Sequence, residues 1–174
     1  LEIGVGSGRT TAYLSRALEK NENLKKLTLV DNWVDWKGEK PEHIKNFQDK
    51  VQLVESDELS FVFEKNKTAY DFIFSDADHC NIQKWFEHVY SSMLKPGGIL
   101  IYHDVSIESH CPKGAFRFPN LEQILIKCKQ YGLSHMHFDK CSTKDEECWR
   151  GLLVIFKSQL QTIVPKDGSL YVLD

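Results

Sequence analysis

Acidic and imidazole side chains recur where short apolar runs of this chain end. The run LTLV is followed by Asp31, the segment FSDADH supplies Asp76 and His79, and the segment ILIYHD supplies His103 and Asp104. Carboxylates and imidazoles can bind a divalent cation, and an imidazole can accept a proton near neutral pH. If these runs are parallel strands, the five side chains share the carboxyl edge of one sheet, where open α/β sheets bind ligands.

The opening segment LEIGVGSG is a second candidate for binding chemistry. A short apolar strand runs into a loop with Gly4, Gly6 and Gly8, and RTTAYLSRALEK follows with helical spacing. Such a unit binds nucleotide-like cofactors in doubly wound sheets, because glycines let the backbone approach a ligand and adopt positive φ. Arg9 stands where the dinucleotide fingerprint G-x-G-x-x-G/A has its last small residue. An ordinary strand-to-helix turn without a ligand is the alternative.

Three positions beyond the glycine loop are candidates for contacts with a nucleoside. Asp31 follows Gly4 by 27 residues, near the spacing of about 20 residues expected of a ribose-binding carboxylate, and a solvated turn aspartate is the alternative. Trp33 could pack on an adenine face or line an acceptor pocket, and packing of its loop on the core explains it equally well. Ser56 and Asp57 could bind the adenine amino group, or Ser56 could cap a helix.

The elements that must position these residues alternate along the chain. We expect strands at Leu27–Val30, Val51–Val54, Asp71–Ser75 and Ile99–Tyr102, with helices between them at about Glu42–Gln48, Glu58–Glu64 and Ile82–Met93. After Asp104 we expect a helix at Leu121–Gln130 and a hairpin of Ser134–Phe138 and Leu152–Phe156, while the strand-like piece Leu170–Leu173 has no assigned place. This alternation predicts a mostly parallel sheet that is covered on both faces.

The composition narrows the class of protein. With 174 residues, 41% apolar and 27% charged, the chain suits one globular domain. The net charge of −3 and the lack of a dense basic stretch disfavour nucleic acid as a partner, and no apolar run reaches membrane-spanning length. The five cysteines form no close C-x-x-C pair, which favours reduced thiols and a cytoplasmic location over a disulfide framework.

The order of these motifs resembles the Rossmann-like S-adenosylmethionine (SAM)-dependent O-methyltransferases, whose relatives include the catechol and macrolide-sugar types. The resemblance runs from Leu1 to about Lys157, and its motifs are LEIGVGSG, Asp31, SDADH, LKPGG and HDV. It implies an α/β, doubly wound, mostly parallel seven-stranded sheet with an antiparallel last strand, and SAM as the cofactor. The cofactor-binding positions that it implies are Glu2, Gly4, Gly6, Gly8, Asp31, Trp33, Ser56, Asp57 and Asp76.

The resemblance also implies a metal site. In the catechol-type relatives, an aspartate after the fourth strand and an Asp-Asn pair after the fifth hold a divalent metal, and Asp76, His103 and Asp104 occupy these places. Mg²⁺ is the default ion, but the His and Asp that replace the pair would also tolerate Mn²⁺, Fe²⁺ or Zn²⁺. His79 stands where those relatives carry the base that deprotonates the acceptor hydroxyl. The alternatives are a hydrogen-bonding His79 and a polar sheet edge without a metal.

The predicted function is therefore methyl transfer from SAM to a hydroxyl of a small molecule. We assign it to a domain of residues 1–157, with residues 158–174 as a C-terminal extension. Because the chain begins inside the first strand, we expect an N-terminal part of the domain to be missing. The alternatives are an NAD(P)-dependent Rossmann oxidoreductase, which the absence of a Tyr-x-x-x-Lys pair disfavours, and a non-catalytic remnant of the methyltransferase fold.

Overall fold

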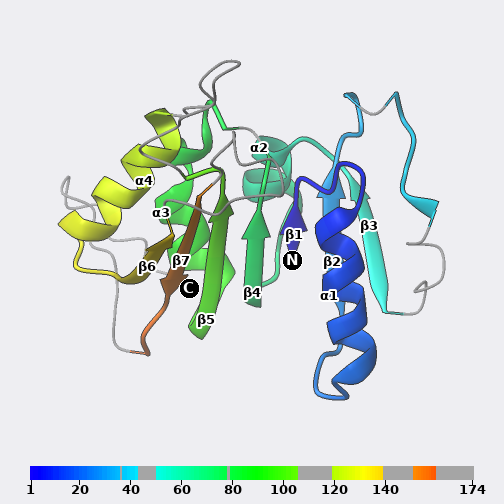
Figure 1. Ribbon diagram of the computed structural model, residues 1–174, viewed down its shortest axis with the longest axis horizontal. Helices are drawn as coiled ribbons and strands as arrows, with labels where there is room; N and C mark the ends of the chain where they lie inside the picture. The colour runs from blue at the N-terminus through cyan, green and yellow to red at the C-terminus, as the bar shows by residue number, and fades with distance from the viewer. Residues whose placement is uncertain (36, 43–49, 78, 106–118, 139–150, 160–174) are drawn as a thin grey trace.

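The computed structural model describes residues 1–35, 37–42, 50–77, 79–105, 119–138 and 151–159, which contain a sheet of seven strands (Figure 1). Their order across the sheet is β3-β2-β1-β4-β5-β7-β6. The strands are β1 (Glu2–Ile3), β2 (Leu27–Asp31), β3 (Val51–Glu55), β4 (Tyr70–Ser75), β5 (Leu94–His103), β6 (Ser134–Phe138) and β7 (Leu152–Phe156). Strand β7 is antiparallel to both of its neighbours, and the other pairs are parallel. The predicted Rossmann-like fold class is thus confirmed.

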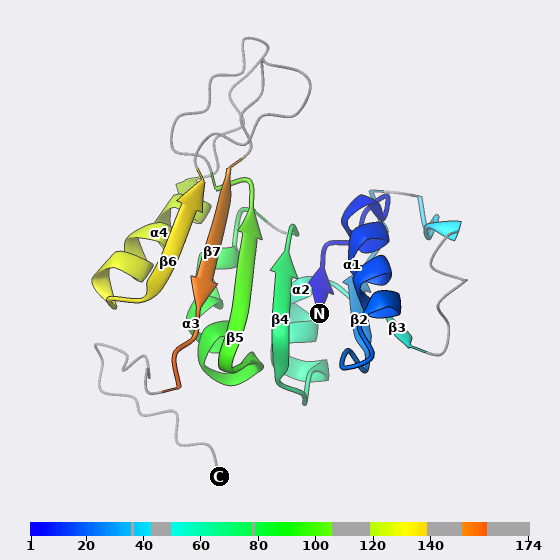
Figure 2. The same ribbon diagram turned by 60° about the horizontal axis from the view of Figure 1, so that its bottom comes forward.

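The central strands are buried because helices pack on both faces of the sheet. Helix α1 (Arg9–Lys20) places Leu18 against Leu27 and Leu29 of β2, and Figure 2 shows this helix on the side of the sheet opposite to α2 and α3. A central strand that is covered on both faces has consecutive buried residues, and Leu27 to Val30 of β2 are all buried.

The opposite face carries the larger core. Its helical segments are α2 (Glu58–Ser60), η2 (Phe61–Lys65), η3 (Ile82–Lys84), α3 (Phe86–His88), η4 (Val89–Met93) and α4 (Pro119–Gln130). Buried side chains of these segments, such as Phe61, Phe86 and Leu125, pack with Val30, Ile73 and Leu100 of the sheet. None of the described helices is long and apolar enough to cross a membrane.

The sequence-based element boundaries hold to within two residues, apart from two larger differences. The predicted helix Ile82–Met93 is interrupted at Trp85, which has a non-helical φ of −118°, and the segments α3 and η4 follow it without a break. Strand β5 begins at Leu94 rather than Ile99, since Leu94 pairs with Tyr70 across an irregularity in the β4–β5 ladder. Most of the predicted helix Glu42–Gln48 and all of Leu170–Leu173 lie outside the described residues.

Candidate functional site

The glycine loop joins β1 to α1 at the carboxyl edge of the sheet. Gly4, Gly6 and Gly8 have φ values of 84°, 51° and 77°, and Gly8 is the N-cap residue of α1. The backbone N–H of Gly4 donates to the carbonyl of Val30 at 2.9 Å, and that of Gly8 donates to the carbonyl of Val5 at 2.8 Å. The loop therefore has a backbone that residues with a Cβ rarely adopt.

Gly4 has a second reason to be glycine. A Cβ at this position would lie 2.2 Å from the carbonyl oxygen of Asp76, which follows β4. The N–H of Asp76 also donates to the carbonyl of Ile3 at 2.8 Å. The close approach that Gly4 allows is therefore to the chain itself, and it brings the glycine loop against the end of β4.

Asp31, at the end of β2, turns its carboxylate toward the glycine loop. Its Oδ2 accepts hydrogen bonds from the N–H groups of Val5 and Gly6, both at 2.8 Å, and its Oδ1 accepts one from the N–H of Trp33 at 2.6 Å. Three backbone donors thus fix the side chain beside the loop. Its contact with a ribose stays a prediction, but its place next to the loop is the one that such a contact needs.

Trp33 lies inside the smaller core. It is 1% exposed and packs with Val5, Leu18 and Leu29. This agrees with the alternative that its loop packs on the core. Its φ of 49° lies in the left-handed region, which is uncommon for a tryptophan. A role for Trp33 against adenine stays a prediction.

The sequence left open whether Ser56 and Asp57 bind the adenine amino group or whether Ser56 caps a helix, and the structure gives the two residues different roles. Asp57, not Ser56, is the N-cap of α2, because its Oδ1 accepts from the N–H of Ser60 at 2.9 Å. This hydrogen bond lowers the pKa of Asp57. The buried Ser56 donates its N–H to the carbonyl of Asp31, while its Oγ has no hydrogen-bond partner among the described residues. A hydroxyl is thus left beside Asp31.

Glu2 is a fully buried acid on β1. Its Oε2 accepts from the hydroxyl of Thr11 at 2.7 Å, and its Oε1 has no hydrogen-bond partner in the described part of the chain. Burial raises the pKa of Glu2 to about 7. A buried oxygen without a donor is costly, so the residue suits a cationic ligand. Thr11 was not identified from the sequence, although its place in the first turn of a helix after the glycine loop was a signal.

Two histidines and two aspartates meet at the ends of β4 and β5. The Nε2 of His79 lies 3.4 Å from Oδ1 of Asp76 and 3.2 Å from Oδ2 of Asp104. The Nδ1 of His103 lies 3.2 Å from Oδ1 of Asp76 and 3.3 Å from Oδ1 of Asp104. The structure therefore brings together the three predicted metal ligands and the predicted base in one group, which we call the Asp-His cluster.

Asp76, His79 and Asp104 of this cluster have the arrangement of a metal site. Each offers one ligand atom, and these atoms lie within 4.8 Å of one another. Asp104 is buried and has a φ of 61°, which an aspartate tolerates better than most residues. The sequence-based ligand set differs, because it contains His103 and assigns His79 to proton transfer.

The charges of the cluster compensate one another. Burial raises the pKa of Asp76, but hydrogen bonds with His103 and His79 outweigh it and hold this pKa below its usual range. Burial lowers the pKa of His79, but hydrogen bonds with Asp104 and Asp76 outweigh it and raise this pKa to about 9. At neutral pH the His79 imidazole therefore carries a proton, which it must lose before it can act as a base or a ligand.

His137 of β6 contacts the residue that follows the Asp-His cluster. Its Nε2 lies 2.5 Å from the carbonyl oxygen of Val105, which directly follows Asp104. The alternation of His135 and His137 along β6 was the available signal, but it did not show which strand end they would approach.

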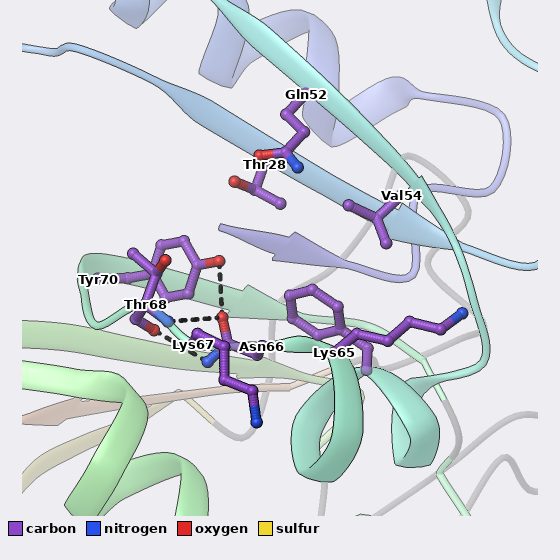
Figure 3. Close-up of a pocket in the computed structure, with 9 residues that line it drawn as sticks. Thr28, Gln52, Val54, Lys65, Asn66, Lys67, Thr68 and Tyr70 are labelled. Atoms are coloured by element: carbon purple, nitrogen blue, oxygen red, sulfur yellow. Dashed lines mark hydrogen bonds between the residues drawn. The ribbon is translucent and has the colours of Figure 1, made fainter.

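A cavity of about 270 Å³ lies away from this edge, between β2, β3 and the end of η2 (Figure 3). Thr28, Gln52 and Tyr70 line it near the amino ends of their strands. The Tyr70 hydroxyl donates to Oδ1 of Asn66 at 3.0 Å, so part of its polar lining is satisfied within the chain. No predicted site residue lines this cavity.

Comparisons with solved structures identify the fold. An O-methyltransferase from Bacillus cereus in complex with SAH shares 18% identity, and the match covers 90% of this chain and 72% of that chain with a TM-score of 0.67. A putative O-methyltransferase from Klebsiella pneumoniae shares 19% identity over 90% and 71% of the two chains, with a TM-score of 0.65. An rRNA methylase from Streptococcus thermophilus shares 15% identity over 91% and 85%, with a TM-score of 0.62. At these identities the similarity shows the fold alone.

A search of curated proteins finds no match. A model of a methyltransferase-domain family matches residues 1–105, which contain β1 to β5, the glycine loop and the Asp-His cluster. Family and fold together support SAM-dependent methylation and disfavour the oxidoreductase alternative. This chain belongs to the methyltransferase-domain family.

Proposed function

We propose that this chain transfers a methyl group from SAM to a hydroxyl of a small molecule, at the carboxyl edge of its sheet and with the help of a divalent cation. The observation that carries the proposal is the contact of Gly4 with the backbone of Asp76. Because of this contact, the glycine loop and the Asp-His cluster lie side by side, as a cofactor half and an acceptor half of one site must.

The residues of the cofactor half suit the parts of SAM. Asp31 presents a carboxylate to the ribose hydroxyls, with charge-assisted hydrogen bonds, while its backbone donors keep it in place. The Oε1 of Glu2 and the Oγ of Ser56 have no hydrogen-bond partner among the described residues. The first suits the ammonium group of the methionyl part, and the second suits a polar contact with the nucleoside. When bound, SAM would supply a methyl carbon on a sulfonium, which a hydroxyl oxygen attacks in line as the C–S bond breaks and SAH leaves.

The residues of the acceptor half suit the activation of a hydroxyl. Asp76 and Asp104 supply the negative charge that holds a divalent cation, and such a cation lowers the pKa of an acceptor hydroxyl when it is bound. The proton then falls to an imidazole of the cluster, for which the sequence indicates His79. The chain must also hold the acceptor oxygen in line with the methyl group, and this positioning accounts for a large part of such catalysis.

A small acceptor fits this site better than a nucleic acid. The Asp-His cluster is compact, and Asp104 is only 7% exposed. The net charge of −3 repels a phosphate backbone, because binding a nucleic acid depends on Lys and Arg contacts.

Calorimetry with SAH and NAD⁺ tests the cofactor half. We expect SAH to bind, NAD⁺ not to bind, and Asp31→Ala to weaken SAH binding at least tenfold. Asp71→Ala is the matched control, because this carboxylate is exposed and pairs with Lys95 at the other end of the sheet. Equal SAH affinity in the Asp31→Ala variant and the parent would remove the basis for the cofactor site.

Transfer of a radiolabelled methyl group from SAM tests the reaction. The acceptors are a panel of catechols, phenols and sugars, with a short RNA duplex as the rival substrate. We expect labelling of a hydroxyl compound and its loss in Asp76→Ala. Labelling of the RNA alone would exclude a small-molecule acceptor, and SAH binding without any transfer would favour the non-catalytic alternative.

A further inference from the structure

The contacts in the Asp-His cluster are long for hydrogen bonds between charged groups. The Nε2 of His79 lies 3.4 Å from Asp76 and 3.2 Å from Asp104, whereas charge-assisted N–H···O bonds are about 2.7–2.9 Å long. Two atoms bound to one ion at about 2.1 Å lie about 3.0–3.4 Å apart at octahedral and tetrahedral angles. The ring nitrogen therefore lies as far from each carboxylate as two ligands of a common ion lie from each other, and the three ligand atoms are within 4.8 Å of one another.

The donor atoms discriminate between classes of ion. Asp76 and Asp104 offer oxygen, but His79 offers a nitrogen within 4.8 Å of both. Mg²⁺ and Ca²⁺ take oxygen ligands and gain little from an imidazole, whereas Mn²⁺, Fe²⁺, Co²⁺ and Zn²⁺ bind imidazole nitrogen well. A mixed set of one nitrogen and two carboxylates therefore favours a first-row transition metal.

The surroundings hold this set in place. Asp104 is buried directly after β5, where its backbone has a positive φ. The Nδ1 of His103 contacts both Asp76 and Asp104, so its ring can orient the two carboxylates without entering the first set of ligands. Residues that contact the ligands without binding the ion orient those ligands and change the affinity for the metal.

We infer that Asp76, His79 and Asp104 form a binding site that prefers a transition-metal dication over Mg²⁺, with His103 positioning the two carboxylates. The inference changes the sequence-based ligand set, because His79 becomes a ligand and is no longer free to act as the base. Only the role of the ion in the reaction rests on the proposed function; the binding site itself does not.

Metal binding to the chelator-treated chain tests this inference. Mn²⁺, Co²⁺ and Mg²⁺ are titrated separately, with calorimetry for all three ions and the visible absorption of Co²⁺ as a report on nitrogen ligation. We expect one Mn²⁺ or Co²⁺ per chain, bound at least tenfold more tightly than Mg²⁺. The variant His79→Asn should lose at least tenfold in Mn²⁺ affinity and should change the Co²⁺ spectrum.

The matched control is His135→Asn. This half-buried histidine on β6 contacts the carbonyl of Leu133 and lies outside the cluster, so its removal should leave Mn²⁺ binding unchanged. Thermal unfolding and SAH binding of each variant show whether it is folded. Equal affinity for Mg²⁺ and Mn²⁺, or unchanged Mn²⁺ binding in folded His79→Asn, would overturn the inference.

The outcomes separate this inference from the proposed function. A chain that binds SAH and transfers methyl groups but does not distinguish Mn²⁺ from Mg²⁺ overturns the metal preference alone. A chain that binds Mn²⁺ through His79 but binds neither SAM nor SAH overturns the proposed function and leaves the metal site standing.

Discussion

The two halves of the sheet edge hold their carboxylates in different ways. Beside β1 and β2, the Asp31 carboxylate accepts three hydrogen bonds from backbone N–H groups of nearby loops. Beside β4 and β5, Asp76 and Asp104 are held by the side chains of His79 and His103. The first half is therefore part of the fold itself, whereas the second depends on the charge of its own members.

This difference indicates how each half can respond to a ligand. Backbone donors stay in place at any pH, so the glycine loop and Asp31 form a preorganised cradle. The imidazoles of the second half carry protons that an ion can replace. An added metal ion should therefore restore the stability of variants in the second half, but not of variants in the first half.

The largest effect is expected from Gly4→Ala in the half held by backbone contacts. The new Cβ would lie 2.2 Å from the carbonyl of Asp76 at a φ of 84°, so either β1 or the end of β4 must move. We expect a loss of about 4 kcal/mol in the free energy of unfolding, together with the loss of SAH binding. Urea denaturation measures the first quantity.

Gly38→Ala is the control for this variant. Gly38 has a similar φ of 79°, but apart from its chain neighbours no atom of the described residues lies within 4 Å of its Cβ position. It should cost about 1 kcal/mol through backbone strain alone. Equal losses in the two variants would show that the contact between Gly4 and Asp76 does not join the two halves.

The next effect is a pH dependence that Glu2 introduces. Its pKa is raised from 4.5 to about 7 by burial, so the protonated acid is the form that the folded state favours. Its stabilising contribution is complete below pH 4.5 and is lost as the pH rises through 7. The loss amounts to about 3 kcal/mol.

The variant Glu2→Gln should lack this pH dependence. The difference in unfolding free energy between the parent and Glu2→Gln should therefore shift by about 3 kcal/mol, in favour of the variant, between pH 4.5 and 8. Parallel curves for the two proteins would contradict a buried, uncompensated Glu2. Bound SAH should narrow the difference, if its ammonium group pairs with Glu2.

His103→Ala tests the half that side chains hold. Removal of this ring leaves Asp76 and Asp104 with one imidazole between them, and we expect a loss of about 2 kcal/mol in unfolding free energy. Added Mn²⁺ should restore much of this stability, because His79 and both carboxylates remain. Mn²⁺ should not restore Gly4→Ala, and rescue of both variants would contradict the distinction between the halves.

The smallest effect is expected from Lys95→Ala, which lies outside both halves. Its Nζ pairs with Oδ2 of Asp71 at 2.9 Å, but both side chains are exposed. The change should alter the free energy of unfolding by no more than about 0.5 kcal/mol and should leave SAH binding unchanged. Urea denaturation measures the effect. A larger loss would mean that exposed ion pairs also contribute to the unfolding free energies measured for the other variants.

Much of the fold was accessible from sequence because its signals are local. Short apolar runs and the glycine loop predicted the strands and the helix ends to within a few residues. The early start of β5 was not predicted, because it depends on pairing of Leu94 with Tyr70 in another strand. The capping role of Asp57 was missed since Ser56 and Asp57 are both favourable N-cap residues and only geometry distinguishes them.

The sequence by itself determined which chemical groups stand at the strand ends, because strand, turn and helix signals depend on neighbouring residues. It thereby placed Asp31 near the glycine loop and Asp76 and Asp104 at one edge. Only the tertiary structure decided that His79 contacts both aspartates and that Gly4 lies against Asp76. The contacts of His79 with Asp104 and of Gly4 with Asp76 join segments that lie 25 or more residues apart in the chain, and their distances follow from how the strands pack rather than from any local pattern.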